Sequence, residues 1–254
     1  MHVAITGAAG EVGRIVADAF DDDRTTLLTH SRHDDIDSTV LDASDRDAFV
    51  DALDGADVLV HLAWAPASRG EWTGEDEVNV RMAVNAFEAA RENGVERVVM
   101  ASSIHVFGMY NRDDPSEFES VVEDPTTTVT TDTQPRPDTY YGVAKVAVEA
   151  LSTYYADRHG LEVVVVRIGW VMPRDELRGT RSELDDKHRF ARAMWLDPRD
   201  CRALFRAAAD HPVDRSPVFA HGISDNGDRY LTLTETMQRL DYRPEEDAAE
   251  VLDS

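Results

Sequence analysis

A glycine-rich turn near the start of the chain restricts its fold more than any other feature of the sequence. An apolar run over 2–6 ends in Gly-Ala-Ala-Gly-Glu-Val-Gly, and a segment with helical character, 11–20, follows. Glycines in this spacing let a backbone approach a pyrophosphate closely, and the helix N-terminus adds free amides and a positive dipole end. The turn therefore predicts a dinucleotide site, with contacts from Gly7, Ala9, Gly10, Glu11, Val12 and Gly13.

Strands and helices alternate along most of the remaining chain. Strand-sized apolar runs cover 25–29, 57–62, 97–101 and 162–168, and helical periodicity covers 75–92 and 140–158. This alternation predicts an α/β fold with a Rossmann-type, doubly wound parallel sheet. We expect residues 1–169 to form the dinucleotide-binding domain. Residues 170–254 should form a small substrate-binding lobe over the carboxyl ends of the strands, irregular over 173–192, with a helix over 199–210 and a strand near Val218.

Charge and composition exclude several classes of protein. Asp and Glu total 50 against 26 Lys and Arg, a net charge of −24, and lysine occurs only at Lys145 and Lys187. Such a chain offers no basic surface to nucleic acid, and no apolar run is long enough to span a bilayer. Its single cysteine, Cys201, excludes an internal disulfide and a cysteine zinc cluster, and we expect no metal.

The same composition bears on where the protein works. No secretion signal is recognisable at the N-terminus, so we expect a cytoplasmic protein. A large negative charge destabilises a compact state in dilute buffer, and salt relieves this repulsion by screening it. The acidic, lysine-poor composition therefore favours a halophile's cytoplasm. A merely acidic protein is the alternative.

The end of the second strand indicates which nicotinamide dinucleotide binds. An acidic side chain there usually bonds the adenosine ribose, but this chain reads Thr29-His30-Ser31-Arg32. Ser31 and Arg32 suit a 2′-phosphate, because arginine binds phosphate through charge-assisted hydrogen bonds. The sequence therefore predicts NADP, with NAD possible. If the register were shifted, the ribose contact would come instead from Asp34 or Asp35.

Other predicted cofactor contacts lie at the ends of later strands and on the helices. Asp42 follows a short strand-like pair, where it would bond the adenine amino group or cap a helix. The backbone after the third strand should line the adenosine side. The predicted contacts outside the glycine turn are Ser31, Arg32, Asp42, Leu62, Ala63, Asn79, Ala101, Tyr141, Lys145 and Ile168.

Tyr141 and Lys145 form the most informative pair in the chain. They lie four residues apart on a predicted helix and therefore share a face. A tyrosine, with an ordinary pKa near 10, is a poor base at neutral pH, but a nearby lysine cation and a cationic nicotinamide ring favour the phenolate. The pair therefore predicts a tyrosine general base. A surface Tyr–Lys pair without function is the alternative.

With these motifs the chain resembles the extended short-chain dehydrogenases of the NAD-dependent epimerase/dehydratase superfamily. The resemblance rests on the glycine turn, Ala101-Ser102-Ser103 closing a strand, Tyr141-x-x-x-Lys145, and Arg167-Ile168-Gly169. Within that superfamily it is most similar to uronate dehydrogenases and to haloarchaeal aldose and glucose-6-phosphate dehydrogenases. The likeness extends into the C-terminal part through 101–105, 194–196, 199–201 and 222–226.

The resemblance implies a reaction and a role for each site residue. Family members of this kind oxidise a cyclic sugar at C1 to a lactone and transfer the hydride to nicotinamide. By this resemblance, Ser103 polarises the reacting hydroxyl, Tyr141 removes its proton, and Lys145 holds the ribose and tunes Tyr141. His105 would touch the sugar, or else be a packed histidine after a strand. The implied substrate contacts are Trp64, Ser103, Ile104, His105, Tyr141, Gly169, Trp170, Arg189 and Trp195.

Departures from the uronate dehydrogenases concern the substrate. Those enzymes carry Asn where Ile104 stands and a serine where this chain has Ala65-Pro66, and Arg189 is out of register with their carboxylate-binding arginine. A neutral aldose such as L-arabinose is therefore expected, with a uronate or a sugar phosphate as the alternative. An epimerase or dehydratase that retains its cofactor shares the fold, while a non-enzymatic NADP sensor would need neither Tyr141 nor Lys145. Related enzymes associate through helices, so we expect a homo-oligomer.

Overall fold

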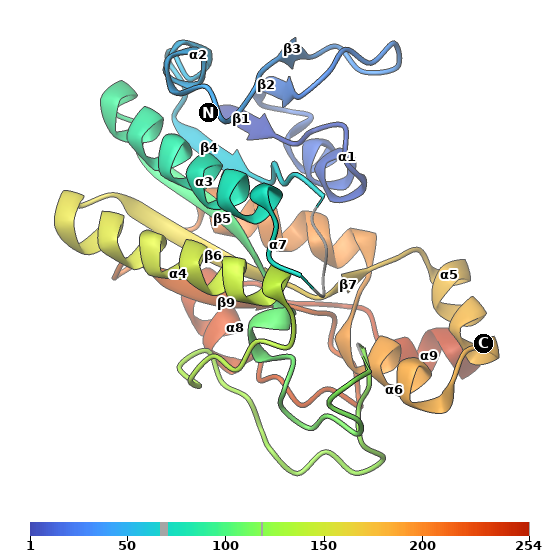
Figure 1. Cartoon of the computed structure of the whole chain (residues 1–254). Helices are drawn as coiled ribbons and strands as arrows, with labels where there is room; N and C mark the ends of the chain where they lie inside the picture. Colours follow the sequence, from blue (N-terminus) through green and yellow to red (C-terminus); the bar gives the residue numbers. More distant parts are fainter. Residues whose placement is uncertain (67–70, 118, 254) are drawn as a thin grey trace.

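A seven-stranded parallel sheet forms the centre of the protein, in the order β3-β2-β1-β4-β5-β6-β9 (Figure 1). The computed structural model describes residues 1–66, 71–117 and 119–253. The strand order reverses between β1 and β4, the switch point at which open α/β sheets bind ligands beyond the strand ends. This confirms the predicted Rossmann-type, doubly wound sheet. Its strands are β1 (His2–Thr6), β2 (Arg24–Thr29), β3 (Thr39–Val40), β4 (Val58–His61), β5 (Arg97–Ser103), β6 (Glu162–Ile168) and β9 (Val218–Gly222).

Helices cover both faces of the sheet, and this explains why its central strands are apolar along their whole length. All seven residues of β5 are buried. One face carries α2 (Arg46–Ala52), α3 (Gly74–Asn93) and α4 (Tyr140–His159), and the other carries α1 (Glu11–Ala17), α7 (Pro198–Asp210) and α8 (Thr234–Leu240). The two long helices α3 and α4 lie side by side (Figure 1). They end at Gly94 and Gly160, whose φ angles of +67° and +71° lie in the left-handed region that glycine commonly adopts at helix C-termini.

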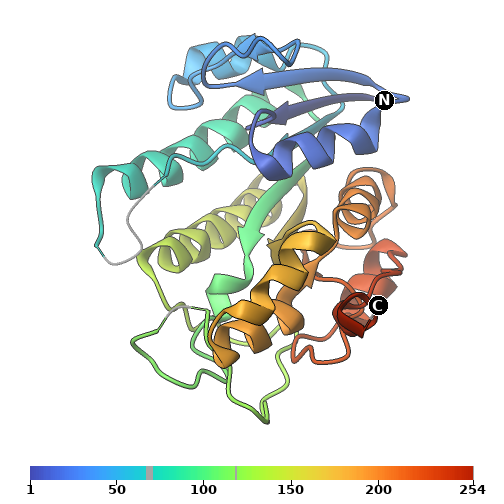
Figure 2. The ribbon, with the colours of Figure 1, turned by 90° about the vertical axis from the view of Figure 1, so that its right-hand side faces the viewer.

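The C-terminal part is more regular than the sequence predicts. The expectation of an irregular segment over 173–192 is wrong, because α5 (Arg174–Gly179) and α6 (Asp185–Met194) occupy it. Both are short and charged on their exposed sides, which hides their apolar faces in the sequence, yet α6 buries Phe190, Ala191 and Met194. Figure 2 shows these helices beside the long loop over 108–138, with α9 (Ala248–Asp253) close by.

After residue 170 the chain first enters the predicted lobe and then returns to the main sheet. The segments β7 (Trp170–Val171) and β8 (Trp195–Leu196) form a small separate sheet, whereas α7 and β9 belong to the large one. A division of the chain at residue 169 therefore does not follow the sheet. We predict that the lobe and the sheet form one compact unit and that the lobe binds the substrate.

Candidate active site

The glycine turn between β1 and α1 is shaped for a close backbone approach. Gly7 has a φ of +70°, and a Cβ on it would lie 2.9 Å from the Ala63 nitrogen. A Cβ on Gly13 would lie 2.1 Å from the Gly7 oxygen, so only glycine fits where α1 crosses the turn. The remaining predicted contacts of the turn, Ala9, Gly10, Glu11 and Val12, stand at its tip and in the first turn of α1, where helix amides have no partner within the helix.

An apolar cavity of about 300 Å³ opens beside this turn, between the ends of β2, β3 and β4. Three predicted cofactor residues, Gly7, Asp42 and Ala63, line it. A glycine cradle next to an apolar cavity at the switch point fits the adenosine half of a dinucleotide. The sequence predicted Trp64 as a substrate contact and did not identify the remaining lining residues, which are Thr6, Leu28, His30, Leu41, Ala43, Ala65, Pro66, Val78 and Met82.

The residues at the end of β2 differ in whether they reach this cavity. Thr29 is buried, and its hydroxyl lies 2.8 Å from that of Ser38, so its side chain does not face the cavity. The next residue, His30, lines the cavity instead. Ser31 and Arg32 are exposed and do not line it. Asp35 pairs with Arg14 on α1, with 2.8 Å between the charged atoms.

Helix α4 places Tyr141 and Lys145 beside the carboxyl ends of the sheet's strands. Thr139 caps the helix by accepting a hydrogen bond from the Gly142 amide at 3.0 Å. A Cβ on Gly142 would lie 2.6 Å from the His105 oxygen, so this glycine lets α4 pack closely on the 3-10 turn 104–107. The ring of Tyr141 is therefore held 5.7 Å from that of His105, centre to centre.

Lys145 is buried between the sheet and an aromatic ring. Its Nζ donates to the Ala101 oxygen at 2.9 Å and lies 3.6 Å from the centre of the Trp64 ring. It is 5.7 Å from the centre of the Tyr141 ring. Burial lowers the pKa of Lys145 to about 7, while the charge of Glu149 acts to raise it. The ammonium is therefore poised to gain or lose its proton near neutral pH.

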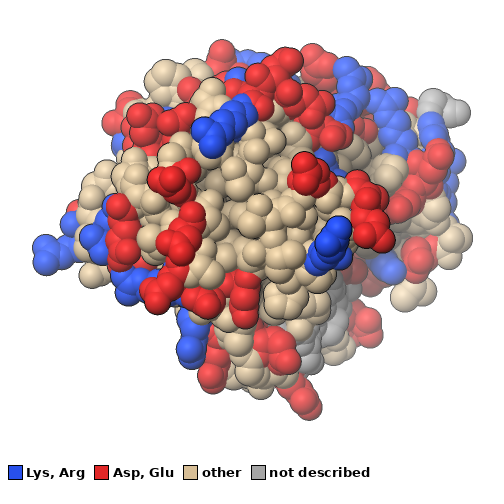
Figure 3. Space-filling model, turned by 90° about the horizontal axis from the view of Figure 1, so that it is seen from above, with Lys and Arg blue, Asp and Glu red and all other residues tan. Residues whose placement is uncertain are grey.

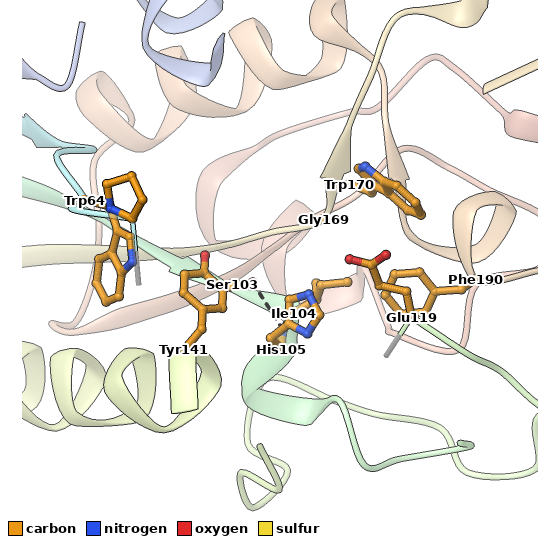
Figure 4. Close-up of a pocket in the computed structure, with 10 residues that line it drawn as sticks. Trp64, Ser103, Ile104, His105, Glu119, Tyr141, Gly169, Trp170 and Phe190 are labelled. Carbon is orange, nitrogen blue, oxygen red and sulfur yellow. Dashed lines mark hydrogen bonds between the residues drawn. The ribbon is translucent and has the colours of Figure 1, made fainter. Parts of the chain in front are cut away.

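A second cavity of about 300 Å³ lies against Tyr141 and shares Trp64 and Pro66 with the adenosine cavity. Figure 4 shows Tyr141 and Ser103 on one side of it and Trp170 and Phe190 on the other. Seven of the nine predicted substrate contacts line it: Trp64, Ser103, Ile104, His105, Tyr141, Gly169 and Trp170. The structure thus brings the Ser–Tyr pair and the aromatic residues together. The sequence missed Pro66, Glu119 and Phe190.

His105 is held in this cavity by a carboxylate from the loop before α4. Its Nδ1 lies 3.0 Å from Asp138, which also accepts from Arg112. Burial alone would raise the pKa of Asp138, but the hydrogen bond and charge of His105 and the charge of Arg112 bring it below its ordinary value. The ionised Asp138 therefore orients the imidazole, which leaves the Nε2 edge for a ligand.

Two predicted substrate residues do not line the cavity. Trp195 is fully buried, and its indole nitrogen donates to the Met172 oxygen at 2.9 Å, so it packs in the lobe's core. Arg189 donates to the Val121 oxygen at 3.0 Å and lines a different cavity. Neither residue lies where the sequence placed it: Trp195 follows α6, in β8, and Arg189 lies on another face of α6 from Phe190, which enters the cavity.

The remaining predicted cofactor residues make hydrogen bonds that hold the strands and loops next to the site. Asn79 is buried, and its amide pairs with the backbone N–H and oxygen of Ala65 at 2.7 and 2.9 Å, which holds the loop after β4. Leu62 donates to Thr6, Ala101 accepts from Lys145, and Ile168 pairs with Ser103 at the end of β6. Within the described ranges, no group of three His, Cys, Asp or Glu side chains is placed to hold a metal ion, and no helix is long and apolar enough to cross a membrane.

Three features together define an extended short-chain dehydrogenase. They are the doubly wound sheet, the glycine cradle beside an adenosine cavity, and the residues Ser103, Tyr141 and Lys145 beside a second cavity. The chain belongs to the NAD dependent epimerase/dehydratase family, whose model matches residues 3–192.

Two relatives and one solved structure are similar to this chain over nearly its whole length. The chain is 44% identical to an L-arabinose 1-dehydrogenase (NAD(P)(+)) of Haloferax volcanii, over 99% of both chains. It is 34% identical to an NAD-dependent glucose-6-phosphate dehydrogenase of the same organism, over 98% of this chain and 94% of the relative. The crystal structure of uronate dehydrogenase from Agrobacterium tumefaciens superposes with a TM-score of 0.78 at 27% identity, over 98% of this chain and 86% of that one.

Proposed function

We propose that this protein is an aldose 1-dehydrogenase that oxidises the C1 hydroxyl of a neutral cyclic sugar, such as L-arabinose, to the lactone. The observation that carries the proposal is that Ser103 and Tyr141 line one small cavity that adjoins the adenosine cavity. Its volume of about 300 Å³ is at the small end for ligand sites, which suits a monosaccharide better than a nucleotide-sugar. The 44% identity to an L-arabinose 1-dehydrogenase over the whole chain supports the same reaction.

The residues of the chain divide the chemistry between them. Bound NADP or NAD supplies the acceptor for the hydride that leaves C1. Tyr141 takes the proton of the C1 hydroxyl, and Ser103 donates a hydrogen bond to the same oxygen as it becomes a carbonyl. Lys145, one helical turn from Tyr141, favours the phenolate when it is protonated. Trp64, Trp170 and Phe190 exclude water from the reacting carbon.

A panel of sugars tests the proposal directly. Pentoses, hexoses, uronates and sugar phosphates are incubated with NAD and NADP in molar KCl, and reduced cofactor is followed by absorbance. We expect turnover with neutral aldoses and a lactone product. An epimerase or dehydratase would convert its substrate without releasing reduced cofactor, so product formation without net reduction contradicts a dehydrogenase.

Cofactor choice should depend on the end of β2. We propose a preference for NADP, and His30→Asp should lower the NADP/NAD ratio of kcat/KM by about ten- to hundredfold, because a carboxylate in the adenosine cavity bonds the ribose and repels a 2′-phosphate. His33→Asp makes the same charge change outside the residues that line this cavity, and should leave the ratio unchanged.

Arg32 is the candidate for holding the 2′-phosphate. Arg32→Ala should weaken NADP use about tenfold and spare NAD, since one charge-assisted hydrogen bond is lost. Arg24→Ala, an exposed arginine at the other end of β2, is the control. A wild type that already prefers NAD contradicts the NADP preference, and Asp35 beside Arg14 then becomes the ribose candidate.

Salt should stabilise the protein. Acidic side chains outnumber basic ones over the face seen in Figure 3, and the net charge is −24. We propose a halophilic protein whose melting temperature rises from low salt into molar KCl as screening relieves repulsion. Choline chloride at equal ionic strength should act similarly if screening is the cause. A melting temperature that stays flat or falls would rule this out.

We also propose a cytoplasmic homo-oligomer. Nicotinamide dinucleotides are kept inside cells, which favours the cytoplasm. The outer face of α4 exposes Tyr140, Val143 and Tyr154 by 42%, 41% and 53%, an apolar strip on which a second copy could pack. Light scattering should give a mass at least twice that of one chain, and Tyr154→Glu should lower it. A monomeric wild type contradicts the oligomer.

A further inference from the structure

The cavity beside Tyr141 contains one carboxylate that the proposed chemistry does not use. Among its described lining residues, Glu119 alone is acidic, and none is lysine or arginine. Figure 4 shows the Glu119 carboxylate directed into the cavity near Trp170, with His105 between it and Tyr141. A sugar whose C1 hydroxyl lies at Tyr141 and Ser103 would therefore extend its other hydroxyls toward Glu119.

The backbone around Glu119 is held in an uncommon conformation. Its φ is +59°, in the left-handed region that side chains other than glycine rarely adopt. The chain that follows is anchored, because Val121 is buried and the Val122 amide donates to the Asn111 oxygen at 2.9 Å. Such strain persists where the surroundings maintain it, and it often marks a functional position.

We propose that Glu119 is a specificity-determining residue that selects neutral sugars and rejects anionic ones. A carboxylate accepts hydrogen bonds from sugar hydroxyls, and it repels a uronate carboxylate or a phosphate that would enter the same space. This inference rests on the proposed function, because it names the substrate class of the same site.

The position of Arg189 supports the inference independently. Its Nε donates to the Val121 oxygen at 3.0 Å, and its guanidinium lies 3.7 Å from Asp113. Arg189, which the sequence placed at the substrate, therefore holds the loop two residues beyond Glu119 and does not line the cavity. The loop thus directs the Glu119 carboxylate into this cavity, while Arg189 lines a different one.

Matched sugars with the same ring hydroxyls test the role of Glu119. D-Galactose and D-galacturonate differ only at C6, where a hydroxymethyl group replaces a carboxylate, and L-arabinose lacks that carbon. The wild type should prefer galactose to galacturonate in kcat/KM. Glu119→Gln should lower this preference at least about tenfold, and Glu119→Arg should lower it about a hundredfold or reverse it.

Glu117→Gln is the control, because it removes an exposed carboxylate from the same loop two residues away. It should leave the preference unchanged. Turnover of neutral sugars with a preference that stays within twofold in both Glu119 variants would overturn this inference alone. No turnover of any sugar by the wild type would overturn the proposed function, and the inference with it.

Discussion

Tyr141→Phe is expected to lower kcat for sugar oxidation by about 10²–10⁴-fold while dinucleotide binding stays within a few-fold. Phenylalanine keeps the ring that packs edge-on against Trp64 at 5.3 Å between centres, so the cavity wall is preserved. Only the hydroxyl that takes the C1 proton is lost. Kinetics with saturating sugar, together with cofactor binding followed by tryptophan fluorescence, separate these two effects.

The adjacent tyrosine provides a matched control for this experiment. Tyr140 is 42% exposed and packs its ring against Trp72, outside the residues that line the catalytic cavity. Tyr140→Phe removes a hydroxyl one residue away and should leave kcat unchanged. If Tyr141→Phe retained normal kcat, the assignment of Tyr141 as general base would be wrong.

Breaking the ion pair between Glu149 and Arg167 is expected to cost about 3–5 kcal/mol of unfolding free energy. The two side chains are 6% and 4% exposed and are joined by two hydrogen bonds of 2.8 and 2.9 Å. Glu149 also accepts from Ser102 at 2.6 Å, next to the catalytic Ser103. Either Glu149→Gln or Arg167→Met leaves a buried group without its charged partner.

The double variant distinguishes lost pairing from a disrupted core. Glu149→Gln with Arg167→Met removes both charges at similar volume and should recover much of the stability, since each single loss includes an uncompensated buried group. The surface pair Lys187–Glu183 is the control, and Lys187→Met should cost below about 1 kcal/mol. Chemical denaturation in high salt compares all four variants with the wild type. Single variants that lose as little stability as the control would refute the prediction.

Local sequence patterns predicted much of the fold. The strands and helices before residue 169 fall within a few residues of their predicted bounds, because glycine caps and apolar periodicity are local signals. The lobe was predicted less well. Helices α5 and α6 are stabilised by packing on α9 and the loop rather than by caps or composition, so the sequence over 173–192 shows little sign of them.

The residues of the candidate site were likewise predicted only in part. The spacing of Tyr141 and Lys145 follows from helix geometry alone and was predictable. Which face of α6 turns toward the cavity depends on how that helix packs, so Phe190 was missed and Arg189 was misplaced. Trp195, in β8 just after α6, was misplaced because it packs in the lobe's core. Glu119 stands in a long loop without periodicity, and no pattern in the sequence marks it.

By itself the sequence determined the doubly wound sheet, the glycine cradle and the Tyr–Lys pair, because each leaves a local pattern: alternating strand and helix segments, the glycine spacing, and the i, i+4 spacing. Only the tertiary structure decided which side chains meet across the cavity. It turned Thr29 inward, placed His30 in the adenosine cavity, joined His105 to Asp138, and brought Glu119 into the cavity that Tyr141 lines. Some of these contacts join segments that are far apart along the chain, and the others depend on which side chain at the end of β2 points into the cavity. In both cases the packing of the whole molecule decides the outcome.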